Sequence, residues 1–192
     1  MIQKQVKSAF LIFVFLTIIT GIIYPLLVTA IAQTFFQHQA NGSIVFKDGR
    51  PIGSSLIGQS FDDPKYFWGR PSATSPRPYN ASTSSGSNLG PLNEALRQAL
   101  EARIKALQSA DPESKQPIPI DLVTASASGL DPHISIAAAM YQVPRVARLR
   151  GMPREKVAQI VKENTQGRFL WVMGEPTVNV LQLNLTLDKY ER

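Results

Sequence analysis

The sequence predicts an α/β protein of the α+β type, with one N-terminal transmembrane helix followed by a compact soluble domain of mixed helices and strands. Three observations support this fold class: a long apolar run without charges near the N-terminus, amphipathic helical patterns in the second half of the chain, and an alternating apolar and polar pattern near its end. The 192 residues are sufficient for one membrane helix and one domain of ordinary size.

The first element is the apolar run, which we expect to cross a membrane. No Lys, Arg, Asp or Glu occurs between Ser8 and Phe46, and residues 9–32 are almost wholly apolar. At 1.5 Å per residue these positions form a helix about 36 Å long, more than the roughly 30 Å hydrocarbon core of a bilayer. The expected divisions are an N-terminal tail at 1–7, the transmembrane helix at 8–32 and the soluble domain at 33–192.

Tyr24 and Pro25 interrupt this predicted helix. Proline has no backbone N–H to donate, so it removes one helical hydrogen bond and kinks the helix. In lipid, such a defect is tolerated best when the helix packs against another helix. We therefore expect Tyr24 and Pro25 to be membrane docking residues.

A cleaved signal peptide is the alternative interpretation of the N-terminus. Lys4 and Lys7 supply a positive n-region, and Ala30-Ile31-Ala32 fits a small-x-small cleavage site. A signal h-region has only about 7–15 residues, so the longer run favours a retained anchor. The same lysines predict orientation, because no basic side chain follows the helix until Lys47. The positive-inside rule places the N-terminus in the cytoplasm and the domain outside.

Composition excludes several kinds of site. The chain has no cysteine, which excludes disulfides, cysteine metal sites and thiol nucleophiles. Its two histidines, His38 and His133, are far apart in sequence, which argues against a histidine metal cluster.

The first half of the soluble domain is predicted to hold a hairpin and an aromatic core segment. Residues 43–46 and 51–58 are β-type runs joined by an Asp-Gly turn. Residues 59–71 contain four aromatic side chains, which we expect to cover a core. Residues 71–91 are rich in Ser, Pro, Gly and Asn, which predicts a linker or mobile loop. An anion cradle is the alternative for this loop, although no Walker motif occurs in the chain.

The second half is predicted to contain three helices and a final strand. The predicted helices cover residues 93–109, 134–150 and 153–163. Residues 126–135 are expected to form a polar turn. Residues 178–187 alternate Val or Leu with Asn, Gln or Thr, which predicts a strand with one buried face.

Basic side chains cluster on the last two predicted helices. They are Arg145, Arg148, Arg150, Arg154, Lys156 and Lys162. A DNA-binding helix-turn-helix is the alternative that this cluster raises. Glu155 and Glu163 on the second helix, and the lack of a polar run that could read bases, argue against it. We expect a solvated basic face or a docking face for an acidic partner, and no nucleic acid.

The sequence contains no self-sufficient catalytic set, so we expect a protein that is not an enzyme. His133 is the one histidine inside the predicted domain, and Asp131 is too close in sequence to be presumed its orienting acid. The Gly-x-Ser-x-Gly motif is absent.

Short motifs along the whole chain form an ordered set. They include Tyr24-Pro25-Leu26-Leu27, Gly69-Arg70-Pro71-Ser72-Ala73-Thr74, Pro78-Tyr79-Asn80, Ser85-Gly86-Ser87-Asn88-Leu89, Ser128-Gly129-Leu130-Asp131-Pro132-His133-Ile134-Ser135, Gln142-Val143-Pro144-Arg145, and Val178-Asn179-Val180-Leu181 with Leu183-Asn184-Leu185. Together they resemble the C subunit of the bacterial Kdp potassium-transporting P-type ATPase. One departure is Ser85, where the family loop is expected to have glycine.

The resemblance implies an accessory subunit, in the bacterial inner membrane, of a high-affinity ATP-driven potassium uptake pump. Its partners would be a potassium-selective channel-like subunit, the ATP-hydrolysing P-type subunit and a small single-helix subunit. The family is described as a catalytic chaperone that raises the ATP affinity of the P-type subunit. The resemblance therefore implies ATP shared transiently with that subunit and no tightly bound cofactor.

The expected ATP or partner contacts lie in the polar motifs of this set: Gly86, Ser87, Asn88, Asp131, His133, Gln142 and Arg145. The charge rule places the domain outside, whereas ATP is cytoplasmic, so direct and indirect effects on ATP binding both stay open. The alternative function is a signal-anchored extracytoplasmic binding or sensor domain that works without a pump.

Overall fold

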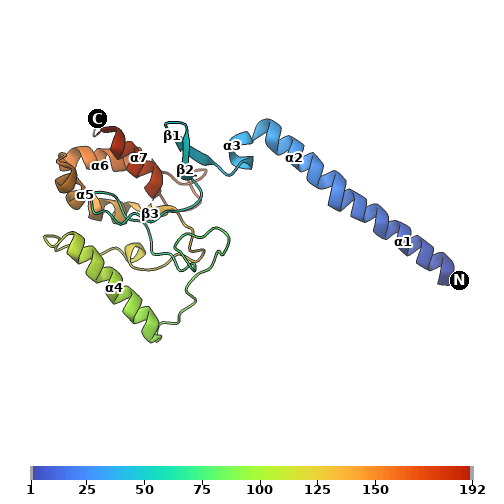
Figure 1. Cartoon of the computed structure of the whole chain (residues 1–192), viewed down its shortest axis with the longest axis horizontal. Coiled ribbons are helices and arrows are strands. Elements are labelled where there is room, and N and C mark those ends of the chain that lie inside the picture. The colour runs from blue at the N-terminus through green and yellow to red at the C-terminus, as the bar shows by residue number, and fades with distance from the viewer. Residues whose placement is uncertain (1, 191–192) are drawn as a thin grey trace. The chain divides into compact units, whose positions relative to one another are not determined.

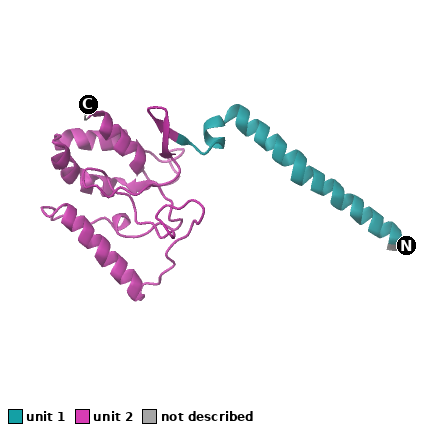
Figure 2. Ribbon diagram, in the orientation of Figure 1, with its two compact units in different colours: residues 1–44 teal, residues 45–192 magenta. Residues whose placement is uncertain are grey.

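The computed structural model describes residues 2–190, and the chain forms two compact units (Figure 2). Residues 1–44 belong to the first unit and residues 45–192 to the second. Each unit has its own local structure, and the fold class predicted from the sequence is confirmed: an apolar helix precedes a compact domain of mixed helices and strands.

The first unit is one long apolar helix followed by a short helical turn (Figure 1). Helix α1 (Ile2–Ile18), a π-helical segment (Ile19–Ile23) and helix α2 (Tyr24–Phe35) follow one another without a break, and α3 (Gln37–Ala40) comes next. The 33 residues from Gln3 to Phe35 are long and apolar enough to cross a membrane. Their side chains are not buried by the rest of the described chain.

The π-helical segment lies directly before the Tyr24-Pro25 break. The backbone N–H of Tyr24 donates to the carbonyl of Ile19, five residues back, where an α-helix would use the residue four back. Pro25 has no N–H to donate, and the wider turn before it lets the helix continue through the proline.

Strands β1 (Ile44–Lys47) and β2 (Arg50–Ser54) form a two-stranded sheet. Asp48 and Gly49 join them with φ angles of 52° and 75°. Both angles lie in the left-handed region that a type I′ hairpin turn requires. The predicted Asp-Gly hairpin is confirmed, although β2 ends at Ser54 and does not continue to residue 58.

A three-stranded antiparallel sheet lies within the second unit, in the order β3-β5-β4. Its strands are β3 (His133–Ser135), β4 (Thr165–Gln166) and β5 (Thr177–Asn179). Ile134 of β3 stands opposite Val178 of β5, and both are buried. The polar turn predicted at 126–135 is therefore shorter than expected, because its last three residues pair as a strand.

The predicted helices of the second half are confirmed as α4 (Glu94–Ala110), α5 (Ile136–Arg150) and α6 (Arg154–Glu163). A 3₁₀ turn at Ile120–Leu122 separates α4 from β3. Polar side chains cap two of the helices: Asn93 accepts from the N–H of Ala95, and Ser135 from that of Ala138. Gly151 ends α5 with a left-handed φ of 62°.

Residues 180–187 form a helix, so the strand predicted at 178–187 is wrong beyond Asn179. Helix α7 (Val180–Tyr190) buries residues at the spacing of one helical face: Val180, Leu181, Leu183, Asn184 and Leu187. Asn179 caps the helix, since its Oδ1 accepts from the N–H of Gln182 at 3.1 Å. The alternating residues fit the strand period, whereas the cap from Asn179 and the burial of Asn184 on the apolar face favour the helix.

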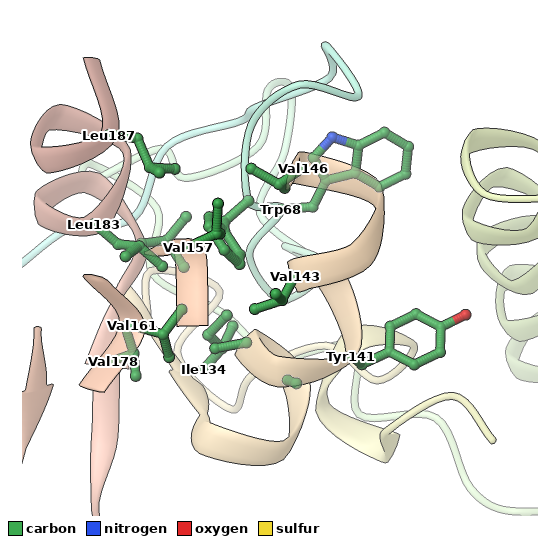
Figure 3. Close-up of a cluster of buried hydrophobic side chains, with 14 of the residues drawn as sticks. Trp68, Ile134, Tyr141, Val143, Val146, Val157, Val161, Val178, Leu183 and Leu187 are labelled. Carbon is green, nitrogen blue, oxygen red and sulfur yellow. The ribbon is translucent and has the colours of Figure 1, made fainter. Parts of the chain in front are cut away.

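The core of the second unit forms where α5, α6 and α7 meet the three-stranded sheet. Figure 3 shows Leu183 and Leu187 of α7 in one cluster with Val157 and Val161 of α6. Each fully buried side chain of this size contributes about 1.5–3 kcal/mol to folding.

Two of the basic side chains of α5, Arg145 and Arg150, do not lie on a solvated face, so that expectation is wrong for them, whereas Arg148 is exposed as expected. Arg145 is 2 % exposed, and the side chain of Arg150 is enclosed and pairs with Asp188 at 3.1 Å. Arg148 pairs with Asp111 at 2.8 Å. These arginines satisfy groups within the domain, which leaves fewer of them for an acidic partner.

Two buried amide side chains hold the aromatic segment, and we call this pair the amide clamp: Gln142 of α5 and Asn184 of α7. Gln142 accepts from the N–H of Trp68 at 2.8 Å and donates to its carbonyl at 3.1 Å. Asn184 does the same for Phe67, at 2.9 and 3.0 Å. Both aromatics are buried, which confirms their predicted place in the core. Buried backbone outside a regular element needs such partners.

Replacing Asn184 by alanine is expected to lower the free energy of unfolding by about 2–4 kcal/mol, because the N–H and carbonyl of Phe67 stay buried without partners. Urea unfolding of the full chain in detergent, followed by circular dichroism, measures the loss. Gln159→Ala removes an exposed amide from α6 and is the matched control, with an expected change within about 0.5 kcal/mol. Equal unfolding free energies for Asn184→Ala and the wild type would contradict the role of the clamp.

Candidate functional site

An open groove of about 550 Å³ lies among the loops of the second unit. Its lining residues are Leu56, Arg70, Ser126, Ala127, Ser128, Leu130, Asp131 and Pro132. Most of them belong to the loop at 126–132, which leads into β3, and Arg70 comes two residues after the clamped Trp68. The amide clamp therefore fixes the point at which Arg70 enters the groove.

Arg70 is held in the groove on two sides. Its Nη1 lies 3.5 Å from Oδ2 of Asp131, and its Nη2 donates to the carbonyl of Ala125 at 3.2 Å. Its Nε is buried and has no hydrogen-bond partner among residues 2–190. The guanidinium thus has a fixed position and keeps unused donor capacity.

Asp131 is the centre of the polar network of the groove. Its Oδ1 accepts from the backbone N–H of His133 at 3.0 Å and lies 3.3 Å from Nδ1 of the same residue. Burial alone would raise the pKa of the Asp131 carboxyl. The hydrogen bonds from His133 and the charges of His133 and Arg70 outweigh burial, so this pKa is lowered. Asp131 is consequently ionised at neutral pH and joins Arg70 to the start of β3.

The Ser-rich segment at 71–91 forms a loop without helix or strand, and hydrogen bonds join it to the groove, so it is not a linker between separate parts. Ser72 Oγ donates to the carbonyl of Gly129 at 2.6 Å, and the N–H of Ser85 donates to the carbonyl of Ser128 at 3.0 Å. Gly129 has a φ of 67°, and a Cβ added there would lie 2.6 Å from the carbonyl oxygen of Ser85. Only glycine fits this approach of the two loops.

A smaller cavity of about 160 Å³ adjoins Arg70 and is lined in part by Tyr79 and Arg103. Tyr79 Oη donates to the carbonyl of Arg70 at 2.5 Å, and Arg103 Nη2 donates to that of Gly69 at 2.9 Å. Burial raises the pKa of Tyr79, which therefore stays a neutral donor at neutral pH. These bonds fix the backbone beneath the groove.

The structure brings three of the sequence-predicted contact residues together. Asp131 lines the groove, and His133 binds its carboxylate. Gly86 packs so closely on the loop at 126–132 that an added Cβ would lie 2.8 Å from the carbonyl oxygen of Ala127. Residues from the Ser-rich loop and from the segment before β3 thus lie close together.

The other predicted contact residues lie elsewhere. Ser87 and Asn88 are exposed beyond Gly86. Gln142 and Arg145 are 1 % and 2 % exposed and bind the aromatic segment inside the domain. Arg70 was not among the residues expected from the sequence to contact a ligand. The sequence feature that could have identified Arg70 is the Gly69-Arg70-Pro71 motif, in which a charged residue stands between two turn residues beside a core segment.

The groove offers a guanidinium, a carboxylate, hydroxyls and backbone carbonyls, which suit binding by hydrogen bonds and charge. No group of three or more His, Asp and Glu side chains that could hold a metal occurs among the described residues 2–190. The carboxylate of Asp131 is already engaged by His133 and Arg70.

One apolar helix long enough to cross a membrane, followed by a compact domain of mixed helices and strands, defines the class of single-helix membrane-anchored proteins. A family model described as "K+-transporting ATPase, c chain" matches residues 6–189 of this chain. The chain belongs to this family, KdpC, as the resemblance of its motifs predicted.

Curated relatives match over nearly their full length, and each is named "Potassium-transporting ATPase KdpC subunit". The relative from Sorangium cellulosum is 60 % identical over 184 residues, which cover 96 % of this chain and 97 % of the relative. The one from Dechloromonas aromatica is 60 % identical over 190 residues, covering 99 % and 100 %. The one from Methylococcus capsulatus is 58 % identical over 182 residues, covering 95 % and 96 %.

Replacing Asp131 by asparagine is expected to destabilise the domain in a pH-dependent way. A carboxyl whose pKa is lowered by folding stabilises the fold when it is ionised, and this stabilisation is lost as the pH falls through the lowered pKa of the folded state. The difference in unfolding free energy between wild type and Asp131→Asn should therefore be full at neutral pH and shrink in acid. Urea unfolding over a pH series measures it.

Ser128→Ala is the matched control for this prediction, since it changes the same groove without removing an ionisable group. Its difference from wild type is expected to stay constant with pH. If the difference in unfolding free energy for Asp131→Asn were also constant with pH, ionisation of the Asp131 carboxyl would not stabilise the fold.

Proposed function

We propose that this chain is a non-catalytic accessory subunit that stabilises an ATP-driven potassium uptake pump in the bacterial cell membrane. The observation that carries the proposal is the extent of the family match, which covers the apolar helix and the domain together, residues 6–189. Curated relatives of nearly equal length are named subunits of a potassium-transporting ATPase. A groove that offers binding groups supports a subunit that works through contacts.

The helix from Gln3 to Phe35 is the proposed membrane anchor. Lys4 and Lys7 lie at its N-terminal end, and the next basic residue is Lys47. This distribution supports a cytoplasmic N-terminus and an extracytoplasmic domain. Tyr24 and Pro25, which follow the π-helical segment, are the proposed contact with a neighbouring membrane helix.

The proposed partners are a potassium-selective channel-like subunit, the ATP-hydrolysing P-type subunit and a small single-helix subunit. We further propose that the chain raises the ATP affinity of the P-type subunit. A domain outside the membrane can do this by binding one conformation of the pump more tightly than another, which shifts the population toward that state. Direct ATP contact through Gly86, Ser87 and Asn88 is the alternative and requires a cytoplasmic domain.

Protease added to spheroplasts is expected to cleave the domain while the inner membrane is intact, because the charge rule places the domain outside. A tag on the C-terminus and immunoblotting measure the cleavage, and a cytoplasmic protein that stays intact is the control. Cleavage of the domain only after lysis would contradict this placement and favour direct contact with ATP.

Purification through a tag on this chain from its native membranes is expected to bring two larger membrane proteins and a potassium-stimulated ATPase activity. The chain alone should hydrolyse no ATP, and the pump without it should show a higher apparent KM for ATP. A chain that purifies from these membranes without partners would contradict the proposal and favour the sensor alternative.

A bulky substitution in the groove tests whether this surface makes the contact. Ser128 is exposed on the groove, and Ser128→Arg is expected to weaken assembly about tenfold or more, the effect of a clash of roughly 1.4 kcal/mol at an interface. Gln98→Arg places the same side chain on the exposed face of α4 and should leave co-purification unchanged. Equal recovery of partners with both variants would exclude the groove as the contact surface.

A further inference from the structure

Residues 168–175 form a short hairpin between β4 and β5, which we call the apolar hairpin. Five consecutive large apolar side chains in it are exposed, with Trp171 at 92 %: Phe169, Leu170, Trp171, Val172 and Met173. Single exposed apolar residues are ordinary on a soluble domain, whereas a contiguous patch of this kind marks a surface that another phase or molecule covers.

The backbone of the apolar hairpin is closed on itself. Phe169 and Met173 exchange two hydrogen bonds, each of 2.9 Å, between their N–H groups and carbonyls. The N–H groups of Trp171 and Val172 donate to the carbonyls of Arg168 and Phe169, both at 3.3 Å. The tip therefore presents apolar side chains while most of its backbone donors are already satisfied.

The base of the apolar hairpin carries no net charge. Arg168 Nη2 lies 3.0 Å from both carboxylate oxygens of Glu175, which closes the hairpin with an ion pair. Leu170 and Trp171 at the tip have left-handed φ angles of 48° and 68°. Bulky side chains rarely adopt this conformation, so the turn holds two of them outward at a cost in backbone strain.

We propose that the apolar hairpin inserts into the lipid interface of the membrane in which the helix is anchored. Backbone groups satisfied within the segment are the condition for entering lipid, where no water replaces a missing hydrogen bond. Tryptophan favours the boundary between headgroups and acyl chains, and Trp, Phe and Leu are typical of apolar faces that bury at this depth. An apolar tip of this size reaches about 5–10 Å into that boundary.

The short segment between α2 and β1 allows the hairpin to reach the membrane surface. Eight residues, 36–43, separate α2 from β1, so the domain begins within about 30 Å of the end of the helix. This inference rests on the proposed membrane anchor and adds a second point of attachment. A protein partner that binds by adding a strand is disfavoured, because Phe169 and Met173 already pair with each other.

The chain has two tryptophans, and neither lies in the apolar helix, so the part of the tryptophan emission that a lipid-borne quencher removes reports on the hairpin. Trp68 is 7 % exposed in the core, whereas Trp171 is at the hairpin tip. The full chain reconstituted into phosphatidylcholine vesicles is expected to show a blue-shifted Trp171 emission that brominated phosphatidylcholine quenches. Bromines near the headgroup end of the acyl chain should quench more than those near its methyl end. Trp171→Phe should abolish the quenchable emission.

Val172→Asp keeps Trp171 and adds a charge at an exposed position, so it should withdraw the tip and remove the quenching. Leu92→Asp alters an equally exposed leucine outside the hairpin and should leave the quenching unchanged. Vesicle flotation after alkaline washing reports on the helix separately. Flotation without quenching would overturn the hairpin inference alone, whereas loss of both would also overturn the anchor. If the Trp171 emission shifts to the blue only when the other pump subunits are present, and lipid does not quench it, the hairpin contacts a protein and not the bilayer.

Discussion

The amide clamp formed by Gln142 and Asn184 is the interaction on which the rest of the domain depends. The segment at residues 59–71 has no regular hydrogen-bond ladder, yet it passes through the core. The clamp satisfies the backbone of Phe67 and Trp68 from two different helices, α5 and α7. Arg70 comes two residues after Trp68, so the same contacts that close the core also set the position of the charged side chain in the groove.

The local elements of the fold follow from the sequence where caps and turns agree with periodicity. Asn93 before α4, Gly151 after α5 and the Asp48-Gly49 turn each mark a boundary that the structure keeps. The strand predicted for the final segment is wrong because its alternating residues also fit a helix, which the Asn179 cap and the long-range contacts of Asn184 with Phe67 favour. Gln142 and Arg145 were expected at the surface for the same reason: their polarity shows in the sequence, but their buried backbone partners do not.

The groove itself was only partly predictable, because it forms from segments far apart in the chain. Asp131 and His133 lie two positions apart in sequence, whereas Arg70 bonds Asp131 and Ser85 bonds Ser128 across more than forty positions. Under the proposed function, such a site has no chemical step to perform and acts through binding alone. If it raises the ATP affinity of the pump, linkage requires that ATP tighten its hold on the pump by the same factor.

The π-helical turn at Ile19–Ile23 changes which side chains of the apolar helix share one face. One extra residue in a turn rotates everything that follows by about 100° around the helix axis. Residues that an unbroken α-helix would place on one face therefore lie on different faces before and after the turn. A neighbouring helix that follows one straight line would meet one face of α1 and a different face of α2, so the two halves can be specialised for separate neighbours within the same bilayer.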